Sequence, residues 1–214
     1  MEKTATEFTD KQLAIIDAAQ KLFAESGFDG TSVRDIAHEA GINVAMISYY
    51  FGSKEKLMEA VFEQKANHTR IKVENLLQNE NLSPLEKVNV LIDDYVDKFI
   101  AQQEFHRIMI REQLIEKNNA VATLIYELKK RNQDSIKKLI HEGQKGGAFK
   151  KNIDIVLMMT TLVGTVSQMI TSQRFYREMN HLEEMPEPEF QKYIRKKLSA
   201  HLKNLFKVIL TYEA

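Results

Sequence analysis

The scarcity and placement of glycine and proline constrain this chain more than any other feature of its sequence. Its 214 residues contain only eight Gly and three Pro, and no Pro lies between residues 85 and 185. Sheets and loops need these residues at their turns, whereas helix interiors exclude proline. Half of the glycines fall within a 26-residue stretch: Gly27, Gly30, Gly41 and Gly52. We therefore predict an all-α fold, with short helices and tight turns in the first 60 residues and long helices after them.

Composition and the absence of motifs exclude several classes of function. With 43% hydrophobic and 28% charged residues, the chain has an ordinary globular composition. It contains no Cys, so a disulfide framework, a thiol nucleophile and a Cys-ligated metal are excluded. The six His residues do not form a metal-binding pair, and no phosphate-binding loop, nucleophile motif or catalytic carboxylate pair is present. We expect no catalytic residues, no metal site, no cofactor and no enzymatic activity.

One segment has nearly the length of a membrane span. Residues 155–173 carry no charge, but eight of these 19 residues are Thr, Ser or Gln. Such polarity is more typical of a buried helix in a helical bundle than of a lipid-facing span. The polar N-terminus lacks the apolar core of a signal peptide, so we expect a cytoplasmic protein without a membrane partner.

Apolar spacing and capping residues place three helices before residue 51. The first is predicted over residues 10–26, because Leu13, Ile16, Ala19 and Phe23 share one face. A second follows over 33–40, capped by Thr31 or Ser32, and a third over 44–50, capped by Asn43. Two short helices joined by a glycine turn and preceded by a longer helix describe a helix-turn-helix.

The remaining residues predict long helices and a second domain. Ser53 caps a helix that runs to about residue 77, and a polar loop is expected over 177–188. The other predicted helices cover residues 84–102, 104–117, 119–145, 153–175 and 187–212. We therefore predict two domains, a helix-turn-helix domain over residues 1–60 and an all-helical domain over 61–214.

The N-terminal motif resembles the DNA-binding domain of the TetR family of transcriptional regulators. The resemblance covers about residues 10–60 and rests on the segments TSVRDIA, AGI and ISYYFGSKEKL in their order and spacing. It implies that Arg34 reaches a base edge or phosphate, that residues 44–46 face bases, and that Lys54 holds a phosphate. Ser48 stands where the family most often has Tyr, so its contact could pass in part to Tyr49 or Tyr50. Adjacent residues of a helix point about 100° apart, so we expect one of these tyrosines to pack and the other to face the groove. The predicted DNA-binding residues are Ser32, Arg34, Val44, Ala45, Met46, Ser48, Tyr49, Tyr50 and Lys54.

Wide apolar stripes on the last two long helices suggest a partner subunit. These stripes are broader than one domain needs, and the resemblance implies that the final helices of two subunits form a four-helix bundle. A homodimer places two recognition helices on successive major grooves and implies a palindromic operator. The predicted interface residues are Ile155, Leu162, Val166, Ile170, Ile194, Leu198, Leu202 and Leu205.

Bulky apolar residues with a few polar ones also suit a small-molecule site in the second domain. An ordinary core needs the same residue types, so both interpretations stay open. The predicted ligand-binding residues are Tyr95, Phe99, Phe105, Met109, Gln113, Tyr126, Met158 and Thr165. By resemblance, a bound ligand would shift the fourth helix, change the separation of the recognition helices and release DNA.

The leading hypothesis is a dimeric, ligand-responsive repressor of transcription that binds double-stranded DNA and an unidentified small-molecule effector. An activator or a DNA-binding protein without a ligand belongs to the same class. The alternative from another class is an all-helical small-molecule-binding or interaction protein without sequence-specific DNA binding.

The net charge of zero hides an asymmetry: residues 1–60 hold six Lys and Arg against ten Asp and Glu, a balance of −4. We therefore expect weak non-specific DNA binding, a shallow salt dependence, and strong reliance on Arg34, Lys54 and Lys56.

Overall fold

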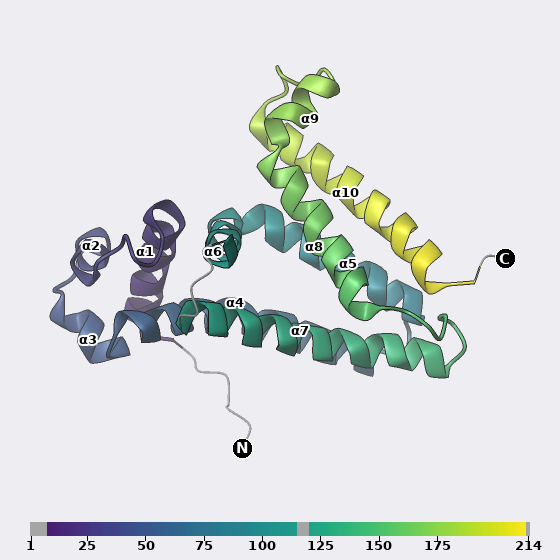
Figure 1. Ribbon diagram of the computed structural model, residues 1–214, viewed down its shortest axis with the longest axis horizontal. Coiled ribbons are helices and arrows are strands. Elements are labelled where there is room, and N and C mark those ends of the chain that lie inside the picture. The colour runs from purple at the N-terminus through teal and green to yellow at the C-terminus, as the bar shows by residue number, and fades with distance from the viewer. Residues whose placement is uncertain (1–7, 115–119, 213–214) are drawn as a thin grey trace. The chain divides into compact units, whose positions relative to one another are not determined.

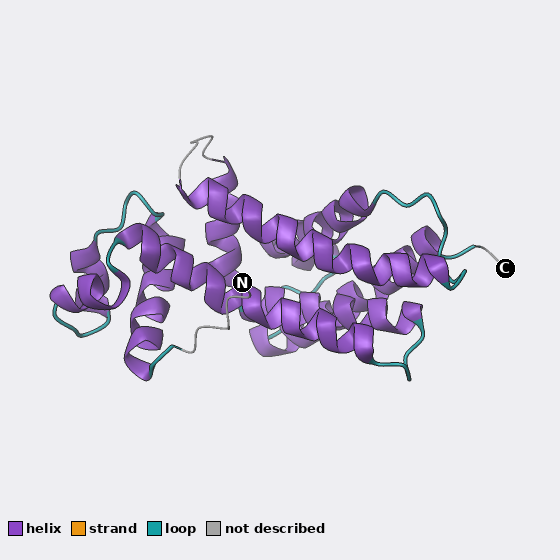
Figure 2. Ribbon diagram, turned by 90° about the horizontal axis from the view of Figure 1, so that it is seen from below, coloured by secondary structure: helices purple, strands orange, loops and turns teal. Residues whose placement is uncertain are grey.

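The computed structural model describes residues 8–114 and 120–212, and it divides into two compact units (Figure 1). Unit 1 comprises Met1–Ile71 and Glu104–Asn132, and unit 2 comprises Lys72–Gln103 and Gln133–Ala214. Every regular element among the described residues is a helix (Figure 2), which confirms the predicted all-α fold. The units differ from the predicted domains because the segment after residue 103 returns to pack with the N-terminal helices.

The helices follow one another with short connections. They are α1 (Asp10–Ser26), α2 (Val33–Glu39), α3 (Ala45–Phe51), α4 (Lys54–Gln78), α5 (Pro84–Ala101), α6 (Gln103–Leu114), α7 (Ala120–Lys145), α8 (Ile155–Thr171), α9 (Gln173–Met179) and α10 (Glu187–Leu210). Most predicted helices begin and end within a few residues of these bounds. The predicted end of the 104–117 helix lies outside the described residues.

Reciprocal capping fixes the start of three helices. At the start of α1 the Thr9 hydroxyl accepts the Gln12 N–H, while the Gln12 side chain accepts the Thr9 N–H. Ser32 with Asp35 does the same for α2, and Ser83 with Glu86 for α5, where Pro84 occupies the first turn. Each box satisfies two N–H groups that would otherwise lack partners, which explains why these boundaries could be predicted locally.

The predicted helix over residues 153–175 is wrong in its C-terminal part, because α8 ends at Thr171 and α9 begins at Gln173. The hydroxyls of Thr171 and Ser172 both bond to the Gln168 carbonyl, and Ser172 leaves helical geometry with φ −113° and ψ 28°. Competition of hydroxyls for helix carbonyls bends a helix. Among the described residues no single helix is long and apolar enough to cross a membrane; α8 and α9 reach that length only as a pair bent by 76°.

Each unit has its own apolar core. In unit 1, α1, α2, α3 and the first part of α4 enclose fully buried side chains including Ile16, Phe23 and Phe62. The Phe62 ring meets the Phe105 ring of α6 edge to face, with centroids 5.2 Å apart. In unit 2, α5 packs against α8 and α10, and the core includes Val96, Val166 and Leu202, all with no exposed surface.

Three aspartates of α5 pair with basic side chains of unit 2. Asp93 pairs with Lys203 of α10, and Asp97 pairs with Arg195 of α10 at 2.6 Å. Asp94 is held between Lys72 and Lys98, each 2.6 Å away. The charges therefore join α5 to its neighbours within unit 2. The partners on other helices lie up to 110 residues away in the chain, so local sequence patterns do not predict those pairs.

Acid should destabilise unit 2 through Asp94. Its burial raises the carboxyl pKa, but hydrogen bonds and charges from Lys72 and Lys98 outweigh burial and leave the pKa below 3.8. In the unfolded chain this carboxyl has a pKa of about 4, and in the folded chain its pKa is lower. The carboxylate therefore stabilises the fold at pH values above about 4, and this stabilisation is lost as the pH falls through the folded-state pKa. We expect Asp94→Asn to cost about 1–3 kcal/mol at pH 7 and to flatten the decline of the melting temperature below about pH 4.

Thermal unfolding between pH 7 and pH 2 measures this effect. Asp134→Asn is the matched control, because Asp134 lies 3.8 Å from Lys137 with 59% of its side chain exposed. An exposed pair contributes little to stability. Equal melting curves for the two variants at every pH would contradict the role given to Asp94.

Candidate nucleic-acid interface

The α2–α3 pair is locked by three small or buried positions. Ile36, Ala37 and Ile47 have 0%, 3% and 1% of their surface exposed. Gly41 has φ +64°, a left-handed conformation that side chains disfavour, and it turns the chain between the helices. The Ile42 N–H then donates to the Ala37 carbonyl. Burial of Ile47 directs the opposite side of α3 to the solvent.

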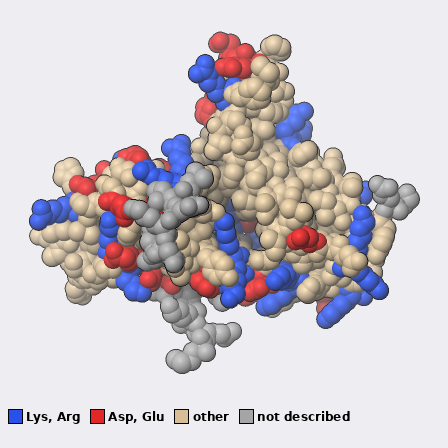
Figure 3. All heavy atoms as spheres, viewed as in Figure 1, with Lys and Arg blue, Asp and Glu red and all other residues tan. Residues whose placement is uncertain are grey.

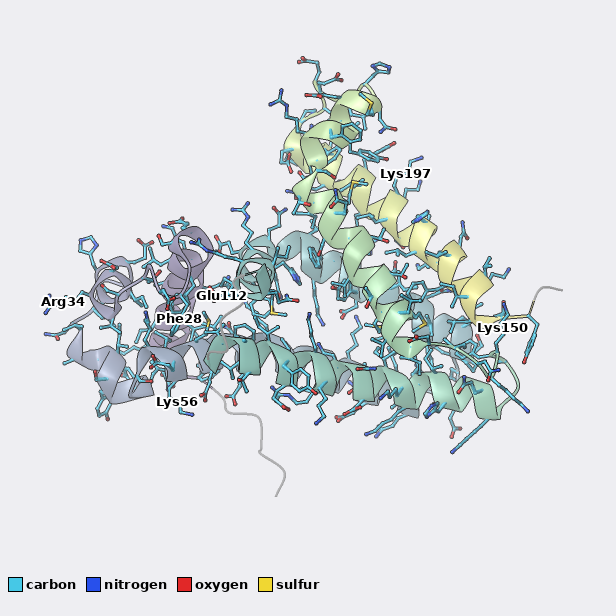
Figure 4. The ribbon with its side chains drawn as sticks, viewed as in Figure 1. Phe28, Arg34, Lys56, Glu112, Lys150 and Lys197 are labelled. Carbon is cyan, nitrogen blue, oxygen red and sulfur yellow. The ribbon has the colours of Figure 1, made fainter. Side chains whose placement is uncertain are left out.

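Capping orients the start of α2 and the residue expected to reach DNA. The Ser32 hydroxyl donates to the Asp35 carboxylate and accepts the Asp35 N–H. The hydrogen bond from the Ser32 hydroxyl lowers the pKa of Asp35 below its usual value. Arg34 is exposed and extends from α2 away from the rest of unit 1 (Figure 4). Ser32 therefore acts as a helix cap in this structure, and its predicted DNA contact stays a prediction.

The solvent side of α3 carries most of the predicted DNA-binding residues. Val44 is 41% exposed and Tyr49 is 79% exposed, and Ala45 and Ser48 are exposed beside them. Met46 is half-buried. These residues lie together on one exposed surface of unit 1, as a helix entering a major groove requires.

Of the two adjacent tyrosines, one packs against the core of unit 1 and the other is exposed. Tyr50 is half-buried and packs against the core of unit 1, whereas Tyr49 stands in solvent. Their rings meet edge to face with centroids 5.0 Å apart, so Tyr50 supports the ring of Tyr49. Tyr49 is thus the tyrosine of the pair that points away from the core, next to Ser48.

The Lys54 ammonium is bonded to backbone carbonyls within unit 1. Its ammonium donates to the carbonyls of Phe28 and Thr31, at 2.8 and 3.0 Å, and lies 4.2 Å from the centre of the Phe28 ring. The side chain therefore ties the start of α4 to the turn between α1 and α2. Its predicted contact with a DNA phosphate stays a prediction.

Further residues that position this turn were missed from the sequence. The hydroxyl of buried Thr31 donates to the Gly27 and Leu22 carbonyls. The carboxylate of Glu112, in α6, accepts the Phe28 N–H at 3.3 Å, and both residues are buried (Figure 4). Arg111 donates to the Glu25 carbonyl. Because Glu112 lies 84 residues from Phe28, its role has no local signal.

Removing the ammonium of Lys54 should loosen the helix-turn-helix. We expect Lys54→Met to lower stability by about 1–3 kcal/mol, because two carbonyls lose a charged donor, and to weaken binding to every DNA sequence. Lys56→Met is the control for stability, since Lys56 is 63% exposed and pairs with Glu59 of its own helix. Thermal unfolding and gel shifts measure both. A loss of DNA binding without any loss of stability would show that Lys54 acts as a phosphate ligand alone.

The predicted ligand-binding residues fall into two groups, one in each unit. Tyr95, Phe99 and Met158 belong to the core of unit 2, where the Tyr95 and Phe99 rings lie 5.7 Å apart. Burial raises the pKa of the Tyr95 hydroxyl. Thr165 is half-buried on α8 of the same unit. The rest lie in unit 1: buried Phe105, half-buried Met109, and the exposed residues Gln113 and Tyr126.

The predicted dimer-interface residues face inward. Six of them are buried in the core of unit 2: Ile155, Leu162, Val166, Ile194, Leu198 and Leu202. Ile170 and Leu205 are half-buried against the same core. These side chains stabilise their own subunit. The exposed apolar residues of the same helices are Val156, Leu157, Val163 and Val208.

Family models match both parts of the chain. Residues 15–61 match the model for bacterial regulatory proteins of the tetR family, and residues 84–198 match a tetracyclin repressor-like C-terminal domain. The first match contains α2 and α3, and the second covers more than half of the chain.

Curated relatives carry the same assignment. A fatty acid metabolism regulator protein of Bacillus subtilis is 26% identical over 162 residues, which cover 76% of this chain and 82% of the relative. The transcriptional repressor NicS of Pseudomonas putida is 30% identical over 155 residues, 69% of this chain and 71% of the relative. These relatives are named as regulators and not as enzymes, which confirms the expectation that the chain has no enzymatic activity.

A solved structure shares the fold. The transcriptional regulator FadR from Bacillus subtilis, solved in complex with stearoyl-CoA, superposes with a TM-score of 0.64 at 23% identity, over 89% of this chain and 96% of that one. With the matched family models and the exposed helix-turn-helix, these likenesses confirm the resemblance seen in the sequence. The chain belongs to the tetR family of bacterial regulatory proteins.

Proposed function

We propose that this protein is a transcriptional repressor that binds a palindromic operator as a homodimer and leaves it when an effector with an apolar chain binds unit 2. The observation that carries the DNA-binding role is the α3 surface, whose exposed side is held outward by buried Ile47 and by Gly41. The repressor role is supported by a relative named as a repressor.

The exposed face of α8 supports the homodimer. Val156, Leu157 and Val163 are 57%, 63% and 37% exposed on a helix without a single charged residue. A Cβ added to Gly164 would meet no atom within 4 Å, so this position leaves room for another helix to approach closely. The surface over α8 in Figure 3 is largely free of charged side chains. Exposed large apolar side chains on an uncharged helix are typical of a surface that another protein chain covers.

Val208 of α10 is a further exposed apolar residue of unit 2. It is 56% exposed, and α10 packs beside α8 in unit 2 (Figure 1). In the proposed dimer, α8 and α10 of both copies meet around a two-fold axis. This arrangement differs from the sequence-based prediction in the residues that touch the partner, because the inner faces are already buried.

The core of unit 2 supports an apolar effector. Tyr95, Phe99 and Met158 join one cluster with flexible and aromatic side chains, and the Tyr95 hydroxyl offers one polar group. The relative named as a fatty acid metabolism regulator and the neighbour solved with stearoyl-CoA make a long-chain acyl-CoA the first compound to test.

A reporter assay tests the proposed function. DNA upstream of the chain's own gene, or an operator obtained by random-sequence selection, is placed between a promoter and a reporter. Expression of the chain should lower reporter output, and purified protein should leave the same DNA when stearoyl-CoA is added but not when coenzyme A is added. Increased output would contradict a repressor, and unchanged DNA binding with acyl-CoA would contradict this effector class.

A further inference from the structure

The exposed start of α3 presents methyl groups to the solvent. Residues 44–51 read VAMISYYF and include no charged or amide side chain. Val44 is 41% exposed, Ala45 is exposed and Met46 is half-buried. The N-terminal residues of a recognition helix are those that reach base edges in the major groove.

Three polar side chains near the start of α3 are already bonded within unit 1. The Asn43 Oδ1 accepts the Ala45 N–H at 2.9 Å and caps α3. Ser32 is joined to Asp35, and the Lys54 ammonium is joined to two carbonyls. To donate to a base edge, the Ser32 hydroxyl would have to give up its bond to Asp35, and moving the Asn43 or Lys54 side chain to a base would break the bonds that hold it, which costs free energy.

The major groove offers such a surface one matching group. Guanine, cytosine and adenine present only hydrogen-bond donors and acceptors there, whereas thymine adds a 5-methyl group. An aliphatic side chain gains contact area against that methyl, and it leaves the polar edge of another base without a partner.

We propose that the start of α3 selects thymine by its 5-methyl group, through Val44, Ala45 and Met46. This inference rests on the proposed function, since it specifies the operator that the protein reads. Arg34, on α2, and the hydroxyls of Ser48 and Tyr49 then serve mainly to position α3 on the duplex.

Deoxyuridine tests the DNA side of this proposal, because it differs from thymidine only by the missing methyl. The full-length chain is first used to select an operator from random duplexes, and each thymine of a half-site is then replaced by deoxyuridine in both half-sites. At one or more positions affinity should fall about fourfold per methyl, or about 16-fold for the symmetric pair, from the transfer free energy of one methyl group.

Protein variants test the other side of the same contact. Val44→Ala should lower affinity for the thymine operator, yet cost little on the duplex that lacks the matching methyl, so the two changes should be non-additive. Arg34→Ala is the matched control, because it should lower affinity for the thymine and deoxyuridine duplexes by the same factor.

The outcomes separate this inference from the proposed function. A selected operator that binds equally well with thymine and deoxyuridine at every half-site position would overturn the methyl readout while leaving the regulator intact. An operator with no fixed thymine in its half-sites would overturn it as well. Failure to select any DNA would overturn the proposed function, and this inference with it.

Discussion

Leu157→Glu should convert the protein from a dimer to a monomer and lower its operator affinity at least 100-fold. Leu157 is 63% exposed on the uncharged outer face of α8. Around a two-fold axis each substitution occurs twice, so two carboxylates would be buried without partners in the interface, which is strongly unfavourable. A monomer holds one half-site, and the loss of the linked second contact removes about 10²–10⁴ of affinity.

Sedimentation equilibrium and gel shifts measure the two effects in the same preparation. Tyr126→Glu provides a matched control, since Tyr126 is also 63% exposed but lies on α7 in unit 1. That variant should remain dimeric. If Leu157→Glu were dimeric at the concentrations where the unmodified chain is, the interface would have to lie elsewhere.

Ile47→Ala should remove DNA binding by loosening the α2–α3 pair. Ile47 is 1% exposed and is the side chain that α3 buries in the core of unit 1. Truncation of a buried isoleucine to alanine costs about 2–5 kcal/mol, because apolar contacts are lost and a cavity remains. A loss of that size in a short helix should free α3 locally, and operator affinity should fall more than tenfold.

Hydrogen exchange of unit 1 amides and operator binding report on this substitution together. Val44→Ala serves as its control, because Val44 lies three residues earlier on the solvent side of the same motif. It should change sequence preference while leaving amide protection nearly unchanged. Normal protection and full operator affinity in Ile47→Ala would disprove the locking role of Ile47.

The helix-turn-helix could be predicted because its determinants are local. Gly27 and Gly41 end helices, and Ser32 with Asp35 starts α2 within four residues. Tyr50 lies three residues after buried Ile47 and shares its side of α3, where it packs against the core, while Tyr49 points about 100° away.

Contacts between distant segments could not be predicted. The bond from the Phe28 N–H to Glu112 and the carbonyl contacts of Lys54 depend on how α4 and α6 return to the α1–α2 turn. A local pattern can mark Lys54 as a cation near a helix start, but it cannot show that carbonyls already surround the ammonium.

The sequence could not show which face of α8 is buried within its own subunit. Its inner residues, such as Leu162, and its outer residues, such as Leu157, are equally apolar, and the segment has no charged residue to mark the solvent side. Hydrophobic periodicity therefore indicates a helix buried on more than one side, but it cannot say which stripe meets its own subunit. The predicted interface was drawn from the residues with the strongest periodicity, and these form the core.

The proposed homodimer should read DNA with two-fold symmetry. Random-sequence selection with the full-length protein, followed by measurement of the number of chains bound per selected duplex, tests it most directly. We predict a palindromic consensus whose half-sites lie about one helical turn apart or a multiple of it, with an even number of chains on each duplex. A consensus without two-fold symmetry, or one chain bound per duplex at saturation, would contradict the account.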